Sequence, residues 1–205
     1  MNNIFLDQPI ASDIIDKLMA FDVKIFFGIN QTHNPVADWI LWVLSQGWSW
    51  AILLLGIFAV VTLRKSPRTW FLILIGIALC FLFPDRVSVM CFKEVFMRLR
   101  PCHALEGVRL FDNHCGGQFG FISSHATNAF ALAMFFSLTY KNIKYFPLMM
   151  ISWAVLVAYS RPYLGVHYPG DILCGAIVGT GLGCLVYFLV SKLKQLLERK
   201  FNMQF

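Results

Sequence analysis

Residues 160–171 read SRPYLGVHYPGD, a polar stretch between two apolar runs that themselves decide the fold. Ionisable side chains are costly to place at a membrane boundary, so they are functional candidates. His167 and Asp171 lie four residues apart, which is one turn if the segment is helical. The carboxylate would then hold one imidazole nitrogen and leave the other free as a nucleophile or base. The competing interpretation is a snorkelling Arg161 and a helix-capping aspartate, and this stretch alone favours neither.

The apolar content of the chain places it in a membrane. Of its 205 residues, 58% are hydrophobic and only 14% are charged, whereas soluble domains carry many more charges. Several apolar runs are shorter than the usual span of about 20 residues, so their ends should lie at the interface or inside a bundle. We predict an all-α integral membrane protein with about five transmembrane helices in a single domain. The runs are residues 47–63, 69–91, 119–140, 145–160 and 172–191.

The net charge of +6 does not indicate nucleic acid, because the basic residues sort by loop. With five crossings, three basic loops fall on one side, which the positive-inside rule makes cytoplasmic. The N-terminus and the 92–118 and 161–171 loops then face outside. The three groups are Arg64, Lys65 and Arg68; Lys141 and Lys144; and Lys192, Lys194, Arg199 and Lys200.

The first 46 residues are predicted to lie on the membrane. Residues 1–34 hold too many charges for a crossing, and their apolar residues between 14 and 26 fit an amphipathic interfacial helix without the features of a signal peptide. Residues 36–45 fit a second interfacial helix with an aromatic belt. The alternative is one long tilted helix over 36–63. The predicted order is thus interfacial helices (1–46), a transmembrane bundle (47–191) and a cytoplasmic tail (192–205).

Two of the six cysteines, Cys102 and Cys115, share the outer loop. They can form a disulfide in an oxidising compartment, or hold zinc together with His103 and His114. The spacing matches no common zinc motif, which favours a site without metal.

A second polar cluster precedes this loop. A continuing helix would put Lys93 and Arg100 on one face, about 10 Å apart along the axis, where both can reach one anion. Pro101 is expected to end that helix. Asp85 is a candidate partner for Arg86 or Arg98.

The third cluster, FISSHATN at 121–128, opens the next apolar run. Ser123 and Ser124 stand where N-cap residues belong, and a helix N-terminus binds anions. His125 is placed to exchange a proton. In the last run, Gly175, Gly179 and Gly183 form a small-residue stripe for close helix packing.

All three clusters lie at the outer ends of crossings. If they converge, they supply three cations, an anion-binding helix start and two histidines. This inventory suits phosphoryl transfer, because spread negative charge is stabilised by fixed cations and N–H donors. No carboxylate cluster indicates a divalent metal, which favours a histidine nucleophile.

The motifs Lys93-x6-Arg100-Pro101, Ser123-Ser124-His125 and Ser160-Arg161-x5-His167-x3-Asp171 resemble the three motifs of the type-2 phosphatidic acid phosphatase superfamily. The resemblance implies that His167 attacks phosphorus and that Asp171 orients it, while His125 protonates the leaving oxygen and later activates water. It also implies that no metal or other cofactor is needed. The phosphate would be held by Lys93, Arg100, Ser123, the backbone N–H of Ser124 and Arg161.

One position departs from the family pattern, which usually reads Pro-Ser-Gly-His at the second motif. Ser124 replaces a glycine whose bare backbone can approach a phosphate closely. Serine can still donate that N–H if its φ is negative, and its hydroxyl can add a contact.

The resemblance implies a lipid phosphatase in a bacterial cytoplasmic membrane with its site facing the periplasm. Candidate substrates are undecaprenyl diphosphate, lipid A and phosphatidylglycerol phosphate. The alternatives are a lipid-to-lipid phosphotransferase, a catalytically inactive lipid binder and an anion or lipid transporter. A transporter is expected to carry internal repeats and polar residues at mid-membrane, which this sequence lacks.

Overall fold

The computed structural model describes residues 9–63 and 65–201, so the predictions that involve Asp7 and Arg64 fall outside it. Every regular element among these residues is a helix, apart from an isolated bridge between Leu99 and Phe119. The helices, including two π-helical segments, are α1 (Pro9–Asn30), α2 (Pro35–Ser45), α3 (Gly47–Ile57), η1 (Phe58–Thr62), α4 (Pro67–Val87), η2 (Ser88–Lys93), α5 (Glu94–Phe96), α6 (Pro101–Ala104), α7 (Ser124–Thr139), α8 (Phe146–Tyr163) and α9 (Pro169–Phe201).

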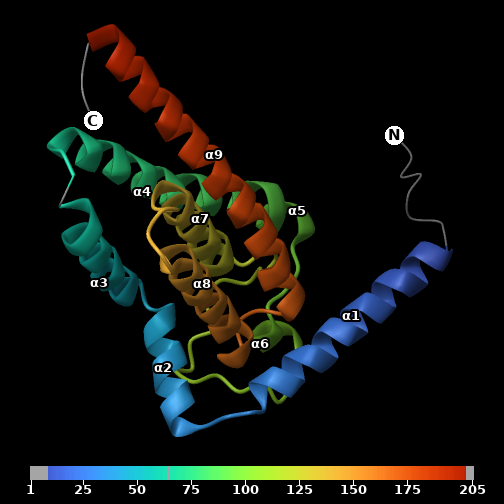
Figure 1. The fold of residues 1–205 in the computed structure, drawn as a ribbon. Coiled ribbons are helices and arrows are strands. Elements are labelled where there is room, and N and C mark those ends of the chain that lie inside the picture. The colour runs from blue at the N-terminus through green and yellow to red at the C-terminus, as the bar shows by residue number, and fades with distance from the viewer. Residues whose placement is uncertain (1–8, 64, 202–205) are drawn as a thin grey trace.

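The N-terminal helix α1 extends away from the bundle (Figure 1). Ile14, Leu18 and Phe21 are all exposed, as expected for a helix whose apolar face lies in lipid. Asn34 then starts α2, because its side chain accepts hydrogen bonds from the backbone N–H groups of Val36 and Ala37. This Asn-Pro sequence is a typical helix start.

Helices α2 and α3 meet at Gln46 with a bend of 70°. Gln46 takes an extended backbone conformation, so the α-helical hydrogen bonding stops there and restarts at Gly47. The alternative of one long helix over 36–63 is therefore wrong.

Helix α7 forms the centre of the bundle and packs most extensively against α8 and α9 (Figure 1). Its contact with α9 depends on the predicted glycine stripe. A Cβ at Gly179 would lie 2.2 Å from the Thr127 carbonyl oxygen, and one at Gly183 would lie 2.4 Å from that of Ala131. The two backbones approach so closely that no side chain fits between them.

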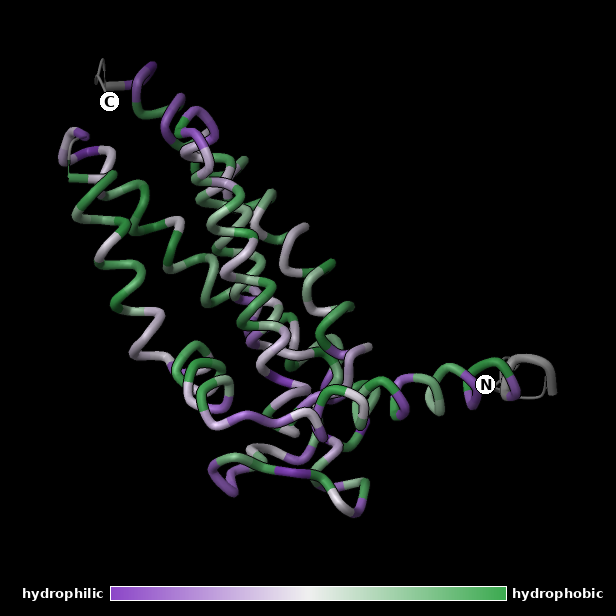
Figure 2. The backbone as a smooth tube through the Cα atoms, turned by 60° about the horizontal axis from the view of Figure 1, so that its bottom comes forward, coloured by the Kyte–Doolittle hydropathy of each residue, from purple (hydrophilic) through white to green (hydrophobic). Residues whose placement is uncertain are grey.

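By length and composition, two continuous helical stretches can cross a membrane, Pro67–Phe96 and Pro169–Lys200. The bent pair Pro35–Ser45 and Gly47–Thr62 makes a third if it counts as one span. Helices α7 and α8 have 16 and 18 residues, so the five-crossing arrangement remains a prediction. Figure 2 shows apolar residues along the bundle helices and polar residues gathered toward their ends.

The two ends of the bundle are tied differently. At one end, the hydroxyls of Thr62 and Tyr140 are 2.8 Å apart, which joins η1 to the end of α7. At the other end, Ser45 lies beside His125 at the start of α7. Helix α9 continues to Phe201, so the described part of the predicted tail extends the last helix.

Candidate active site

The three polar clusters converge on one cavity of about 250 Å³ at the end of the bundle that holds the start of α7. Most of the predicted site residues line it. Ser123 and Asp171 do not line it: the Ser123 side chain caps α7 at the Ala126 N–H, and Asp171 lies beside His167. The lining residues are Lys93, Arg100, His114, Cys115, Gly116, Ser124, His125, Arg161 and His167.

His167 is held on both ring nitrogens. Its Nδ1 lies 3.3 Å from Asp171 Oδ2, and its Nε2 lies 3.1 Å from Arg100 Nη1. A guanidinium only donates, so Nε2 accepts and the ring proton sits on Nδ1, where the carboxylate accepts it. His167 precedes α9 and Asp171 lies in its first turn, so the predicted pair forms without a helix through both residues.

Burial and the nearby cations both favour a neutral His167 ring. Burial lowers the pKa of His167 well below its usual value, and the cations Arg100, Arg161 and Lys93 lower it further. Both effects disfavour the imidazolium. A neutral ring with its lone pair on Nε2 is the form that can attack phosphorus.

Three cations form the walls of the cavity from different elements. Lys93 ends η2, Arg161 lies in the last turn of α8, and Arg100 lies in an extended segment. The Nε atoms of Arg100 and Arg161 are buried and have no hydrogen-bond partner among the described residues. Buried donors are nearly always paired, so these two groups are arranged for an acceptor such as a phosphate oxygen.

A chain of hydroxyls continues from Lys93. Lys93 Nζ donates to Ser124 Oγ at 2.8 Å, and Ser124 Oγ lies 2.8 Å from Ser88 Oγ. Ser88 already donates to the Asp85 carbonyl, so Ser124 donates to Ser88. Ser124 is also the first residue of α7 and has a negative φ, which leaves its N–H at an anion-binding helix start. The departure from the family pattern therefore adds a contact to Lys93.

His125 is oriented by the break between α2 and α3. Its Nε2 lies 3.2 Å from the Ser45 carbonyl oxygen, which can only accept. Nε2 therefore carries a proton, and exchange with a substrate falls to Nδ1. Trp50 packs edge-on against the same ring, with centroids 5.9 Å apart.

The prediction that a helix continues from Lys93 to Arg100 is wrong. The helix ends at Phe96, because Met97 takes a left-handed conformation with φ 45°. Residues 98–100 run extended beside Phe119, and Pro101 starts α6 instead of ending a helix. Arg98 pairs with Asp22 and Asp171, and not with Asp85.

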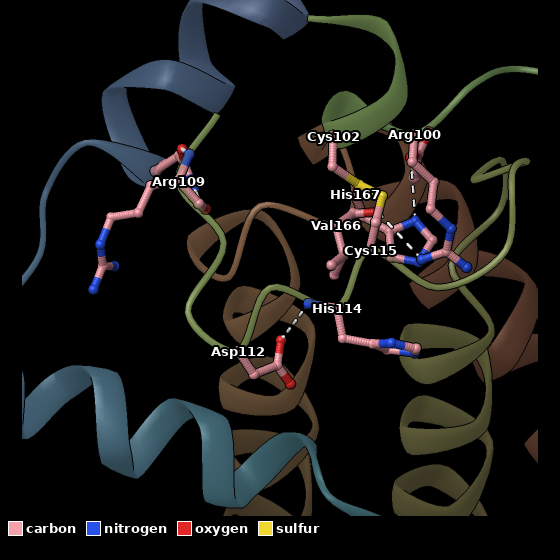
Figure 3. Close-up of a disulfide and its surroundings, with 10 residues drawn as sticks. Arg100, Cys102, Arg109, Asp112, His114, Cys115, Val166 and His167 are labelled. Atoms are coloured by element: carbon pink, nitrogen blue, oxygen red, sulfur yellow. Dashed lines mark hydrogen bonds and ion pairs between the residues drawn. A yellow bond between two sulfur atoms is a disulfide. The ribbon is translucent and has the colours of Figure 1, made fainter. Parts of the chain in front are cut away.

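The 105–120 loop supplies one wall of the cavity through His114, Cys115 and Gly116, a contribution that the sequence did not predict. Cys102 and Cys115 form a disulfide, and Figure 3 shows it beside the Arg100–His167 pair. A Cβ at Gly120 would lie 3.2 Å from Asp171 Oδ2, so a glycine lets the chain pass close to the dyad.

The Cys102, His103 and Cys115 ligand atoms lie within 4.8 Å of one another. With the two sulfurs bonded to each other, only His103 of the three keeps a free ligand atom. This arrangement does not fit a zinc site, which needs four ligands.

Comparison with known proteins identifies the family of this chain. The sequence model of the PAP2 superfamily matches residues 69–195. A lipid A 4'-phosphatase of Porphyromonas gingivalis is 31% identical over 176 residues, which cover 84% of this chain and 74% of the relative. A lipid A 4'-phosphatase of Bacteroides thetaiotaomicron is 29% identical, with 90% and 84% covered.

The fold is also that of a solved membrane enzyme. The crystal structure of a transmembrane PAP2-type phosphatidylglycerolphosphate phosphatase from Bacillus subtilis superposes with a TM-score of 0.61 at 24% identity, covering 90% of this chain and 89% of that one. With the family match over most of the chain, the chain belongs to the PAP2 superfamily and is a membrane lipid phosphatase.

Proposed function

We propose that this protein removes a phosphate from a membrane lipid through a phosphohistidine on His167, without a metal ion. The observation that carries the proposal is the placement of the His167 ring, whose Nδ1 lies 3.3 Å from Asp171 Oδ2 and whose Nε2 lies 3.1 Å from Arg100 Nη1 at a cavity lined by cations. Fixed cations in a water-poor site stabilise the charge that develops on a transferred phosphoryl group.

The first step starts with phosphate binding. The phosphate oxygens accept from Arg100, Arg161, Lys93 and the Ser124 N–H. They draw the Arg100 guanidinium from Nε2, because a phosphate anion is a stronger acceptor than a neutral imidazole. Nε2 then forms a bond to phosphorus as the bond between phosphorus and the lipid oxygen breaks.

Proton transfer belongs to His125. The Ser45 carbonyl holds Nε2–H, so proton donation requires the imidazolium form, which the negative charge of the bound phosphate favours. In this form Nδ1 gives its proton to the leaving lipid oxygen, and the ring becomes neutral. The freed Nδ1 then takes a proton from water, which attacks the phosphohistidine and releases phosphate. Asp171 stabilises the charge on His167 while the intermediate exists.

The proposed substrate is a phosphorylated glycolipid of the lipid A type, which two relatives named lipid A 4'-phosphatase support. The proposed location is a bacterial cytoplasmic membrane with the cavity facing the periplasm. The basic loops support this sidedness, because Lys65 and Lys141 belong to the end marked by Thr62 and Tyr140, opposite the cavity.

The test is phosphate release by purified protein in detergent with EDTA. Lipid A, undecaprenyl diphosphate, phosphatidylglycerol phosphate and phosphatidate are each offered to the wild type and to His167→Ala. We expect release from lipid A, and a fall of about 10⁴-fold or more in the variant, as for loss of other nucleophiles. An alkaline quench, which preserves phosphohistidine, followed by mass spectrometry should find the phosphate on His167.

Each contrary result is informative. Release that His167→Ala leaves unchanged contradicts the mechanism, and loss of activity in EDTA contradicts metal independence. Preference for another lipid corrects the substrate. Release that requires a second lipid as acceptor identifies a phosphotransferase.

A further inference from the structure

Arg98 lies behind the proposed catalytic pair and bridges two carboxylates. Its Nη1 lies 2.8 Å from Asp171 Oδ1 and its Nη2 lies 2.6 Å from Asp22 Oδ2. The guanidinium carbon also sits 4.0 Å from the centroid of the Tyr168 ring. Charge-assisted hydrogen bonds of this length, with a planar donor stacked on a ring, fix a guanidinium in one orientation.

The two oxygens of Asp171 have separate tasks. Oδ2 accepts from His167 Nδ1 and from the Tyr168 N–H, whereas Oδ1 has Arg98 as its only hydrogen-bond partner among the described residues. The Asp171 side chain is 0% exposed, so in the folded protein Oδ1 is satisfied by Arg98 and not by solvent. The rotation of this carboxylate, and with it the proton on His167 Nδ1, therefore depends on Arg98.

Helix α1 completes the arrangement through Asp22. Its Oδ1 accepts from the Gly170 N–H at 2.8 Å in the first turn of α9, and its Oδ2 accepts from Arg98. A Cβ at position 170 would lie 2.9 Å from Asp22 Oδ2, so the glycine makes this approach possible. Asp22 thereby fixes Arg98 relative to the turn that carries Asp171.

Arg98 faces away from the phosphate. It lines an apolar groove between α1 and the bundle, and it is not among the residues that line the 250 Å³ cavity. Asp171 lines neither the groove nor the cavity, and it is bonded to Arg98 on one side and to His167 on the other. A phosphate bound beside Arg100 would reach His167 from the opposite side, so Arg98 can act on the reaction only through Asp171.

On the basis of the proposed function, we infer that Arg98 and Asp22 are positioning residues for the phosphoryl transfer. Asp22 holds Arg98, Arg98 holds the Asp171 carboxylate, and the carboxylate holds the His167 tautomer. Asp22 lies outside the segment that matches the family, residues 69–195. Helix α1 is thus part of the catalytic architecture, in addition to any role at the membrane surface.

The test compares kcat and KM for phosphate release from the lipid that the wild type hydrolyses best. We expect Arg98→Gln to lower kcat by about 100-fold with KM almost unchanged, since misplacement of a reacting group by about 1 Å costs this much. Arg98→Lys, which keeps the cation, should recover part of the loss. Asp22→Asn should lower kcat less than Arg98→Gln does. Asp13→Asn is the matched control, since Asp13 lies on the same helix in an exposed pair with Lys17, and should leave kcat unchanged.

A double-mutant cycle with Asp171→Asn separates positioning from a general structural role. If Arg98 acts through Asp171, Arg98→Gln should cost little more in the Asp171→Asn background, whereas a loss of fold lowers both backgrounds equally. Equal losses, an effect on KM alone, or unchanged kcat in Arg98→Gln would overturn the inference. If Arg98→Gln does not fold, the same double-mutant cycle is measured with Asp22→Asn in place of Arg98→Gln, and the same criteria apply. A wild type inactive on every lipid contradicts the proposed function instead.

Discussion

Two hydrogen bonds decide what the His167 imidazole can do. Asp171 accepts a hydrogen bond from Nδ1–H, and Arg100 donates one to the Nε2 lone pair in the free protein. In the proposed mechanism, His167 is thus already in its reactive tautomer, and its Nε2 is covered by a guanidinium until the phosphate displaces it. Each partner therefore has a separate effect that a substitution can measure.

The pH dependence should report the His167 environment. Burial, and then Arg100, Arg161 and Lys93, lower the pKa of His167 well below its usual value. A lowered pKa means that the ring stays neutral as the pH falls, so kcat/KM should decline on the acid side only well below about pH 6.5. In Arg100→Gln one of these cations is gone, so the pKa rises and the acid limb should move to higher pH. Arg86→Gln, an exposed cation on α4, serves as the control. An acid limb that stays in place in Arg100→Gln argues against His167 as the titrating group.

A leaving-group comparison should isolate His125. Without a proton donor at the leaving oxygen, His125→Ala should lower turnover of a lipid phosphate by about 10²–10⁴-fold. The release of p-nitrophenol from p-nitrophenyl phosphate should fall far less in its first turnover, because that leaving group needs no proton. Equal losses on both substrates would show that His125 binds phosphate instead of donating a proton.

At the scale of elements, the sequence predicted which polar clusters form the site better than it predicted the backbone conformation within and between them. The three clusters converge as expected, because each follows or precedes an apolar run that must cross the bundle. The Lys93–Arg100 helix was mispredicted, because nothing in the local sequence required Met97 to be left-handed. Contacts such as Asp22–Arg98, 76 residues apart, could not be predicted, since they depend on where α1 docks.

The glycine stripe gives a prediction about helix packing. A Cβ at Gly179 would lie 2.2 Å from Thr127 backbone oxygen, whereas one at Gly181 would meet nothing within 4 Å. Gly179→Ala should destabilise the bundle by about 1–3 kcal/mol through overpacking. Gly181→Ala, on the same helix, should stabilise it by about 0.5–1 kcal/mol by removing backbone freedom. Thermal unfolding in detergent measures both, and equal effects would show that α7 and α9 do not pack this closely.

The disulfide gives a second prediction at this scale. It ties Cys102, two residues after Arg100, to Cys115, which precedes Gly116 in the cavity wall. Closing a loop of this size removes about 3 kcal/mol of chain entropy. If loss of the disulfide weakens substrate binding by about 1.4 kcal/mol of this free energy, the double variant Cys102→Ser/Cys115→Ser should raise KM about tenfold. The value of kcat should change little, because the His167–Asp171 pair lies outside the loop. Cys91→Ser, which replaces an exposed free cysteine, should change neither constant.

At the scale of the whole molecule, the chain separates its chemistry from its basic loops. The cavity, the α1–α2 turn and the 105–120 loop share one end of the bundle, and the Thr62–Tyr140 pair marks the other. Asn30 joins the first of these ends by bonding Arg109 and Tyr163. Since the helices between His33 and Lys141 would cross three times in the five-crossing arrangement, these two positions should lie on opposite sides of the membrane.

Single cysteines at these positions test the arrangement in a variant whose four free cysteines are replaced by serine. With a maleimide that does not cross the cytoplasmic membrane, His33→Cys should be labelled in cells with a permeabilised outer membrane. Lys141→Cys should be labelled only after lysis, because its basic loop is retained in the cytoplasm. Both residues are exposed in the folded chain, so burial cannot explain a failure to react. The reverse pattern would place the cavity in the cytoplasm and would require a substrate lipid in the inner leaflet. Labelling of both before lysis would contradict an odd number of crossings between them, and with it the five-crossing arrangement.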